Sequence, residues 1–183
     1  MKWIDFPNLR QSFEYDCGAK VMHAILAYYG ISTNEYDVLR VARTDPRKGT
    51  SLQGMLAVAK HFRLTAEVKE ISVEELKKYI DKKMPIIILL QAWPKRKIKD
   101  WKNHWADGHY VVAIGYDKQK IYFEDPYSVL RTFLTYKELE DRWHDLVGLH
   151  WGSRRKETER YHVAIVVQGS KNKYSSTRAI HMD

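Results

Sequence analysis

Residues 11–30 read Q-S-F-E-Y-D-C-G-A-K-V-M-H-A-I-L-A-Y-Y-G, a polar segment that turns into a helix at Cys17. Asp16 can cap the start of this helix, and Gly30 can end it in the left-handed conformation. The apolar residues form two adjacent stripes along the helix: Val21, Ala24, Ile25 and Tyr28 in one, and Met22, Leu26 and Tyr29 in the other. A helix that is apolar over so much of its circumference is buried.

Cys17 is the only cysteine in the 183 residues, and it lies in the first turn of this predicted helix. The free N–H groups and the positive end of the helix dipole favour the thiolate, which is the nucleophilic form of the side chain. A lone cysteine can equally be a small core residue. A catalytic role for Cys17 therefore requires a base elsewhere in the chain.

His109 is the best candidate for that base among the eight histidines. His23 follows on the same helix as Cys17, about 240° around it at 100° per residue, so it points elsewhere. His109 opens a predicted strand over residues 110–114, and a second strand covers residues 121–124. If the hairpin closes around Asp117, His109 lies opposite Asp125, with Cβ atoms about 4.5–5.5 Å apart.

A carboxylate beside an imidazole fixes its tautomer and stabilises the imidazolium, as in catalytic triads. The alternative is an ordinary His–Asp pair at the end of a sheet. Gln11 adds a further indication, because acyl transfer needs hydrogen-bond donors for the oxyanion of the tetrahedral intermediate. A glutamine amide a few residues before the cysteine, with the N–H of Cys17 itself, can supply them.

The remaining pattern predicts an α+β protein, because helices dominate the first part of the chain and strands the second. We expect further helices at residues 34–43, 51–62, 72–82 and 136–144, and further strands at residues 64–70, 86–92 and 162–168. The apolar run at 86–92 predicts a central, fully buried strand. Residues 1–168 read as a single domain, and residues 169–183 as a loose polar tail.

The amino-acid composition indicates which classes of binding partner and which cellular compartment to expect. The net charge of +8 favours anionic partners, although it can also serve solubility alone. One cysteine allows no internal disulfide, which suits a reducing compartment. The sequence holds no apolar run long enough to cross a bilayer, and its first residues lack the apolar core of a signal peptide, so we expect a cytoplasmic protein with no membrane span.

Residues 93–107, which lie just before His109, are rich in basic and aromatic side chains: Trp93, Lys95, Arg96, Lys97, Lys99, Trp101, Lys102 and Trp105. We predict a surface loop with Trp101 and Trp105 at the rim of a substrate cleft, and Asp16 as a further substrate contact. A nucleic-acid site, with lysines on phosphates and tryptophans on bases, is the alternative. His104, Asp107 and His109 are close in sequence, but no fourth ligand is evident, so we predict no metal and no cofactor.

Together these segments resemble peptidase family C39. The resemblance rests on Q-S-F-E-Y-D-C-G-A-K-V-M with A-Y-Y-G, on G-T-S-L-Q-G-M-L, and on G-H-Y-V-V-A-I-G-Y-D with F-E-D-P, and it spans residues 11–126. It implies a papain-like cysteine peptidase fold, with N-terminal helices, the cysteine on the first, packed on a mainly antiparallel sheet. It also implies Cys17 as nucleophile, His109 as base and acid, Asp125 as orienting residue and Gln11 as oxyanion donor.

The family includes bacteriocin-processing peptidases that cut leader peptides after a double glycine, so the resemblance implies a peptide or protein substrate. Its best-known members are domains of transporters, but this sequence has no G-x-x-x-x-G-K-[ST] loop, and we expect no ATP site. The same four residues would also serve an acyltransferase or a deamidase. A module that binds a peptide or partner without cutting it is a further alternative.

Overall fold

The computed structural model describes residues 1–147, 158–170 and 174–177. Five helices lie in these residues: α1 (Cys17–Tyr28), α2 (Glu35–Ala42), α3 (Leu52–His61), α4 (Val73–Asp81) and α5 (Tyr136–Arg142). The strands are β1 (Lys2–Trp3), β2 (Thr65–Glu70), β3 (Ile86–Gln91), β4 (Gly108–Tyr116), β5 (Lys120–Glu124), β6 (Thr132–Thr135), β7 (His144–Val147), β8 (Thr158–Tyr161) and β9 (Val163–Gln168).

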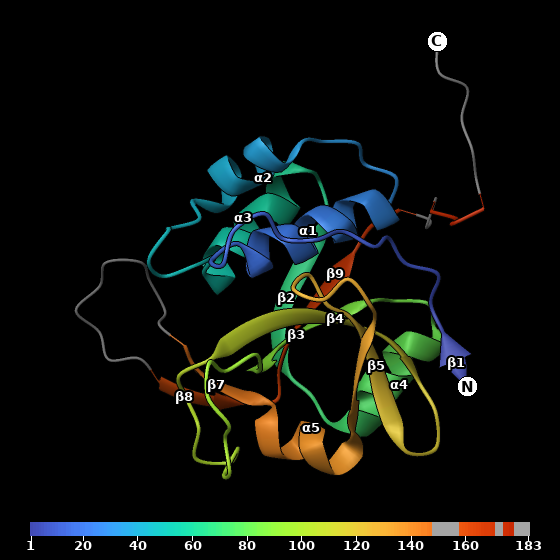
Figure 1. Cartoon of the computed structure of the whole chain (residues 1–183). Coiled ribbons are helices and arrows are strands. Elements are labelled where there is room, and N and C mark those ends of the chain that lie inside the picture. The colour runs from blue at the N-terminus through green and yellow to red at the C-terminus, as the bar shows by residue number, and fades with distance from the viewer. Residues whose placement is uncertain (148–157, 171–173, 178–183) are drawn as a thin grey trace.

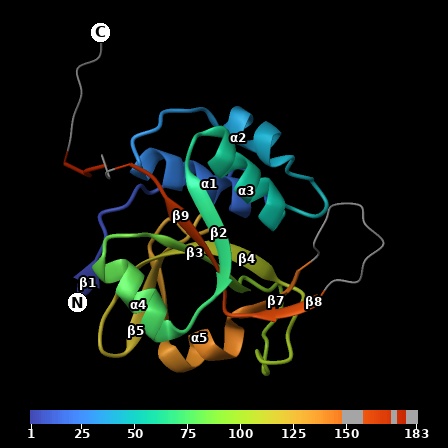
Figure 2. The same cartoon turned by 180° about the vertical axis from the view of Figure 1, so that it is seen from behind.

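The helices lie on both sides of one twisted sheet. Helices α1, α2 and α3 gather on one side, and α4 and α5 lie on the other (Figures 1 and 2). The strand order is β2-β9-β3-β4-β5-β6, with β1 added beside β4, and every strand pair in the described residues is antiparallel. The predicted α+β class, with the cysteine on the first helix and a mainly antiparallel sheet, is confirmed.

Strand β3 is the centre of the sheet, as its β-branched run predicts. All six of its residues are buried, and it pairs with β4 on one edge and β9 on the other. Residues 86–88 pair on both edges, which satisfies their backbone groups, and helices cover both faces of the sheet, so residues 86–90 are all apolar. Strand β3 thereby fixes the position of β4, which begins at the candidate site.

The helix boundaries largely follow the predicted caps. The side chains of Asn34, Ser51 and Ser72 accept hydrogen bonds from the first turns of α2, α3 and α4, and Gly30 has a φ of 75° after α1. Asp16 occupies the cap position of α1, but the prediction that its side chain caps the helix is wrong. The N–H of Ala19, which an N-cap side chain would bind, donates to Thr50 Oγ1 at 3.1 Å instead.

The hairpin of β4 and β5 has a different register from the predicted one. A turn centred on Asp117 would pair Ala113 with Ile121, but the structure pairs Ala113 with Phe123 and shifts register between Ala113 and Gly115. A tight turn held by Asp117 causes this change of register. The Asp117 N–H donates to the Lys120 carbonyl at 3.0 Å, and the Asp117 carboxylate accepts from the N–H groups of Gln119 and Lys120. On the His109 side of this shift the displacement is two residues along β5, so Ala113 and the residues before it stay on the predicted face of the sheet.

The C-terminal third contains more strand than the sequence pattern predicted. Strands β6 and β7 were not predicted. The charged sequence of residues 152–160 predicts a loop, but residues 158–161 form β8, and residues 152–157 lie outside the described residues. In the predicted loose tail, the N–H of Tyr174 donates to Tyr28 and that of Ser176 to Asp5, while residues 171–173 and 178–183 lie outside the described part. In the part of the chain described, no helix combines the length and the apolarity needed to cross a membrane.

A buried carboxylate ties the N-terminal segment to the sheet. Glu124, at the end of β5, has a side chain only 3% exposed and lies between Arg10, at 2.7 Å, and Arg131, at 3.0 Å. The same arginines bind the carbonyls of Val129 and Phe6. This Arg–Glu–Arg clamp joins residues 6–10 and 129–131 to the strand that leads into Asp125.

We predict that Glu124→Gln lowers the free energy of unfolding by about 1–3 kcal/mol, because it leaves two guanidinium groups without their shared anion. Both arginine side chains remain partly exposed to solvent, so the loss of unfolding free energy is smaller than for a fully buried ion pair. Urea unfolding followed by tryptophan fluorescence measures it. Glu67→Gln, at an exposed ion pair with Lys69, is the control and should leave the midpoint unchanged. Equal midpoints for wild type and Glu124→Gln would show that the clamp contributes nothing.

Candidate active site

His109 and Asp125 form a buried pair at one end of the sheet. His109 is the second residue of β4, Asp125 directly follows β5, and their exposed fractions are 6% and 3%. His109 Nε2 lies 2.8 Å from Asp125 Oδ1. The predicted contact is confirmed although the register was wrong. In the observed register the two residues are diagonal neighbours on one face, a separation that long side chains span.

The Asp125 carboxylate accepts four hydrogen bonds from four segments. Oδ1 accepts from His109 and from the backbone N–H of Tyr127 at 2.9 Å. Oδ2 accepts from Trp93 Nε1 at 3.0 Å and from Thr132 Oγ1 at 3.3 Å. Burial alone would raise the pKa of Asp125, but the hydrogen bond and charge of His109, with the Tyr127 and Trp93 donors, hold it below its usual value. Asp125 is therefore ionised in the neutral range.

Trp93 is a site residue that the sequence pattern did not identify. It follows β3, has a φ of 57° and stacks its ring 4.8 Å from that of Tyr127, which in turn meets His109 edge-on. A left-handed backbone is costly for an aromatic residue and persists only where its surroundings hold it. The feature that identifies Trp93 is the register of β3 and β4. It pairs Leu90 with His109, so the end of β3, and Trp93 after it, lie at the site.

Cys17 reaches the other side of the His109 ring from the first turn of α1. It is partly exposed, and its side chain hydrogen-bonds with His109. Because Nε2 faces Asp125, Nδ1 is the ring nitrogen left for the thiol. Burial would lower the pKa of His109, but the hydrogen bonds and charges of Asp125 and Cys17 outweigh it and raise the pKa to about 9. His109 is thus an imidazolium throughout the neutral range.

The segment before Cys17 is a bonded loop. The Asp16 carboxylate, which is fully buried, accepts from the N–H groups of Ser12 and Phe13, both at 3.2 Å. The Phe13 carbonyl accepts from Gln11 Nε2 at 2.8 Å, and the Gln11 N–H donates to the Pro126 carbonyl at 2.9 Å. Gln11 is therefore linked both to the loop of Cys17 and to the residue after Asp125. Asp16, predicted as a substrate contact, lies beneath this loop.

Asp16 belongs to a small polar cluster at the base of α1. Burial and the neighbouring Glu35 raise the pKa of Asp16, although the N–H donors of the loop oppose this. Glu35 itself forms an ion pair with Lys20 at 2.8 Å and accepts from Ser12 Oγ at 2.9 Å. The loop that carries Gln11 is thus anchored to two helices, α1 and α2.

Trp101 and Trp105, predicted at the cleft rim, have contacts elsewhere. The Trp101 ring lies 3.8 Å from the Arg142 guanidinium of α5, and Trp105 packs 4.3 Å from His144 of β7. Within residues 93–107, the tryptophan in contact with Asp125 is Trp93. His104 binds Asp107 at 2.6 Å, apart from the His109 pair.

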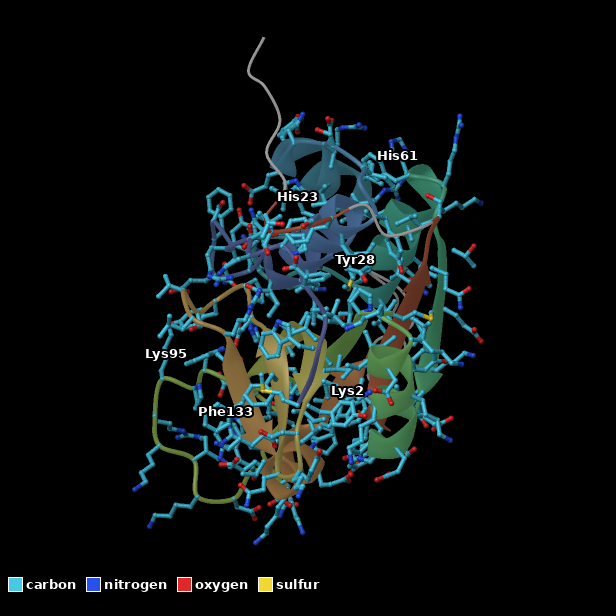
Figure 3. All side chains as sticks on the ribbon, turned by 90° about the vertical axis from the view of Figure 1, so that its right-hand side faces the viewer. Lys2, His23, Tyr28, His61, Lys95 and Phe133 are labelled. Carbon is cyan, nitrogen blue, oxygen red and sulfur yellow. The ribbon has the colours of Figure 1, made fainter. Side chains whose placement is uncertain are left out.

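The other histidines have separate surroundings. His23 points away from the site, as predicted, and its Nε2 lies 3.0 Å from the Thr33 carbonyl; Figure 3 shows it among the helices. His144 is buried and bonds to the His104 carbonyl, and His61 lies against Phe62. His150 lies outside the described residues. His109 is therefore the histidine that meets both Cys17 and a carboxylate.

This arrangement can perform nucleophilic acyl chemistry. A thiol at a helix start contacts an imidazole, and the imidazole is held by a buried carboxylate. Such an order of nucleophile, base and orienting residue activates a thiol for attack on a carbonyl carbon. Among the described residues, no cluster of three or more His, Cys, Asp or Glu side chains could hold a metal ion.

Comparison with known proteins agrees with this geometry. The model of the peptidase C39 family matches residues 5–151. The pediocin PA-1 transport/processing ATP-binding protein PedD of Pediococcus acidilactici is 25% identical over 131 residues. These residues are 72% of this chain but 16% of that protein, so the chain spans about a sixth of the length of this relative.

Solved structures resemble the fold at 20% identity. A double glycine motif protease from an AMS/PCAT transporter, solved with its leader peptide, has a TM-score of 0.64 over 91% of this chain and 93% of its own. The peptidase domain of Streptococcus ComA, a bifunctional ABC transporter, has a TM-score of 0.63 over 87% of this chain and 95% of its own. Since the family model covers most of the sequence and the fold agrees with it, this chain belongs to the peptidase C39 family, a family of cysteine peptidases.

Proposed function

We propose that this chain cleaves a peptide or protein substrate with Cys17 as nucleophile, His109 as general base and acid, Asp125 as the orienting residue and Gln11 as an oxyanion donor. The observation that carries the proposal is the buried His109 ring, bonded to Asp125 on one side and to Cys17 on the other. A histidine held in this way keeps one tautomer and one orientation.

The reaction proceeds in two acyl-transfer steps. The Cys17 sulfur bonds to the scissile carbonyl carbon, and the carbonyl π electrons move to the oxygen. Collapse of this tetrahedral species breaks the C–N bond, and the His109 imidazolium gives its proton to the leaving amine. A water molecule then loses a proton to His109 and attacks the thioester; the C–S bond breaks, the acid is released, and the thiolate–imidazolium pair is restored.

We assign two donors to the oxyanion. The Gln11 amide carries two N–H groups, and one of them is used on the Phe13 carbonyl, which leaves the second for a substrate oxygen. The Cys17 backbone N–H lies in the first helical turn, where N–H groups have no intrahelical acceptor. Donors fixed before the substrate arrives stabilise the developing charge without reorganisation.

Asp16 acts as a positioning residue for this oxyanion site, because it helps to fix the Gln11 amide. Its carboxylate holds the Phe13 N–H, and the Phe13 carbonyl holds the Gln11 amide. We therefore replace the expectation of a direct substrate contact with a role in fixing Gln11. The buried Asp16 carboxylate is thus connected to the Gln11 amide through two hydrogen bonds, both made by the backbone of Phe13.

A peptide substrate is supported by the family and by the double glycine motif protease that was solved with a leader peptide. Hydrolysis is favoured over acyl transfer or deamidation because it is the chemistry of the family. A binding module without catalysis would not require the contacts that Cys17, His109 and Asp125 make. We further propose that the enzyme acts in the cytoplasm, where a catalytic thiol stays reduced.

Alkylation of Cys17 tests the thiolate–imidazolium pair. Since the pKa of His109 is raised to about 9, the imidazolium is present below that pH and is lost as the pH rises through it. We predict that iodoacetamide labels the folded protein at pH 6 at least about tenfold faster than the same chain unfolded in guanidinium, whose thiol ionises near pH 8.5. Intact mass follows the reaction at a single site, because Cys17 is the only cysteine.

His109→Ala should remove this advantage at pH 6 and approach the wild-type rate above about pH 9, where the wild-type imidazole is neutral. His61→Ala, at an exposed position, is the matched control and should label like wild type. Equal labelling of His109→Ala and wild type at pH 6 would contradict the pair.

A double-mutant cycle tests the path from Asp16 to Gln11. We predict that Gln11→Ala lowers kcat by about 100-fold with little change in KM, the usual loss for one oxyanion donor. Asp16→Asn should lower kcat by about tenfold in wild type but by less than about twofold in the Gln11→Ala background, since coupled residues are not additive. Glu14→Gln, exposed on the same loop, is the control. Additive effects would assign Asp16 a structural role independent of Gln11.

A further inference from the structure

The loop between β3 and β4, residues 92–107, has a firmly bonded base. The N–H of Ala92 donates to the Asp107 carbonyl, and the N–H of Asp107 donates to Gln91 Oε1, both at 2.9 Å. Trp101 packs against Arg142, and Lys102 forms an ion pair with Asp141 at 3.5 Å. The second half of the loop is therefore attached to α5 and to the end of β3.

The first half of the loop carries four cations that the rest of the protein does not neutralise. This basic tip consists of Lys95, Arg96, Lys97 and Lys99, all exposed. Within the described part of the chain none of them has an ion pair or hydrogen bond, and the one acid beside them, Asp100, accepts from Asn103. Figure 3 shows Lys95 on a loop that projects away from the sheet.

Like charges placed so close together repel one another, and residues 1–147, 158–170 and 174–177 offer them no ion pair. An anionic partner would relieve that repulsion. The bonded base also lowers the ordering cost of binding, because part of the loop is already fixed before a partner arrives. The basic tip thus has the charge and the held base of a binding surface for an anion.

The basic tip lies close to the proposed catalytic site. Trp93 donates a hydrogen bond to Asp125. Lys95 is only two residues further along the chain, so the Cα atoms of Trp93 and Lys95 are at most about 7.6 Å apart. An extended peptide advances about 3.4 Å per residue. Residues a few positions from a scissile bond at Cys17 therefore come within reach of the basic tip.

The packing of the tryptophans favours a peptide over a nucleic acid. Binding of single strands combines cations with aromatic faces on which bases stack. Here Trp93 packs at a tilt against Tyr127, Trp105 at a tilt against His144, and Trp101 lies under the Arg142 guanidinium. The cations are available, whereas each of these rings already has a partner within the protein.

We propose that the basic tip binds acidic residues of the peptide substrate, a few positions from the scissile bond, and so makes the enzyme selective for substrates with an acidic flank. This inference rests on the proposed peptidase function and names the substrate class of the same site. Exposed ion pairs contribute little each, so we expect two of them to give a selectivity of about fivefold, weakened by salt.

The test uses matched fluorogenic peptides that carry either two Glu or two Gln on one flank of the cleavage site, with each flank tried in turn. For the wild-type full chain at low salt, kcat/KM should be about fivefold higher for a Glu peptide, mainly through KM, and should converge with the Gln peptide at high salt. The tip variant replaces all four cations with glutamine. It should lose this preference and cleave the Gln peptide like wild type.

A control variant makes the same change in net charge at four exposed lysines elsewhere, namely Lys60, Lys82, Lys118 and Lys137. It should keep the preference. The proposal is overturned if wild type cleaves Glu and Gln peptides equally on both flanks, or if the control variant loses the preference as the tip variant does. Salt-sensitive binding of an oligonucleotide that is lost only in the tip variant, with no peptide preference, would overturn it in favour of a nucleic acid.

Failure of the peptidase function would be visible separately. If no peptide is cleaved and Cys17→Ala behaves as wild type, the proposed function fails. Fluorescence anisotropy of labelled Glu and Gln peptides on the Cys17→Ala chain then still measures the basic tip. Tighter binding of the Glu peptide that depends on the four tip cations supports the proposal, and equal binding overturns it.

Discussion

The buried charge of Asp125 is the constraint on which the architecture of this site depends. A carboxylate that is 3% exposed can stay ionised only if the protein replaces the hydrogen bonds of water. Its four donors come from β4, from the loop after β3, from the turn after β5 and from the start of β6. None of these segments can move without leaving part of the charge unpaired. The orientation of His109 follows from the same requirement.

The sequence predicted the His109–Asp125 contact by an argument that was partly wrong. The hairpin does not close around Asp117 as a symmetric turn, because the Asp117 carboxylate accepts from the N–H groups of Gln119 and Lys120 and a register shift follows near Gly115. The contact survives because the side chains of a strand alternate with a period of two, so an even displacement keeps the same face. Local pattern thus fixes which side chains share a face, whereas turn chemistry and irregularities set how far along the strand they meet.

Features that depend on distant partners could not be predicted in the same way. The cap of α1 fails because Thr50, far along the chain, takes the N–H that Asp16 would have bound, and Asp16 turns to the preceding loop. Strands β7 and β8 are four residues each and pair only with one another, so their local pattern is weak. Trp93 is recognisable only after β3 and β4 are aligned. In each case a contact between remote segments, which the pattern around the residue does not record, decided the structure.

Cys17 and His109 belong to different layers, so their alignment depends on how closely α1 approaches β4. A Cβ on Gly18, the residue after Cys17, would lie 2.8 Å from Thr50 Cβ and 3.1 Å from the Tyr110 ring. A Cβ on Gly108, the residue before His109, would lie 2.2 Å from the Asp145 carboxylate. A larger residue at position 18 would push α1 away from Thr50 and Tyr110 of β4, because real Cβ atoms do not approach so closely. A larger residue at position 108 would displace the Asp145 side chain of β7. Gly18 of the D-C-G segment therefore does no chemistry itself, but it allows α1 to approach β4 until the thiol meets the imidazole. The motif that identifies the chemistry in the sequence is for this reason also the motif that closes the fold.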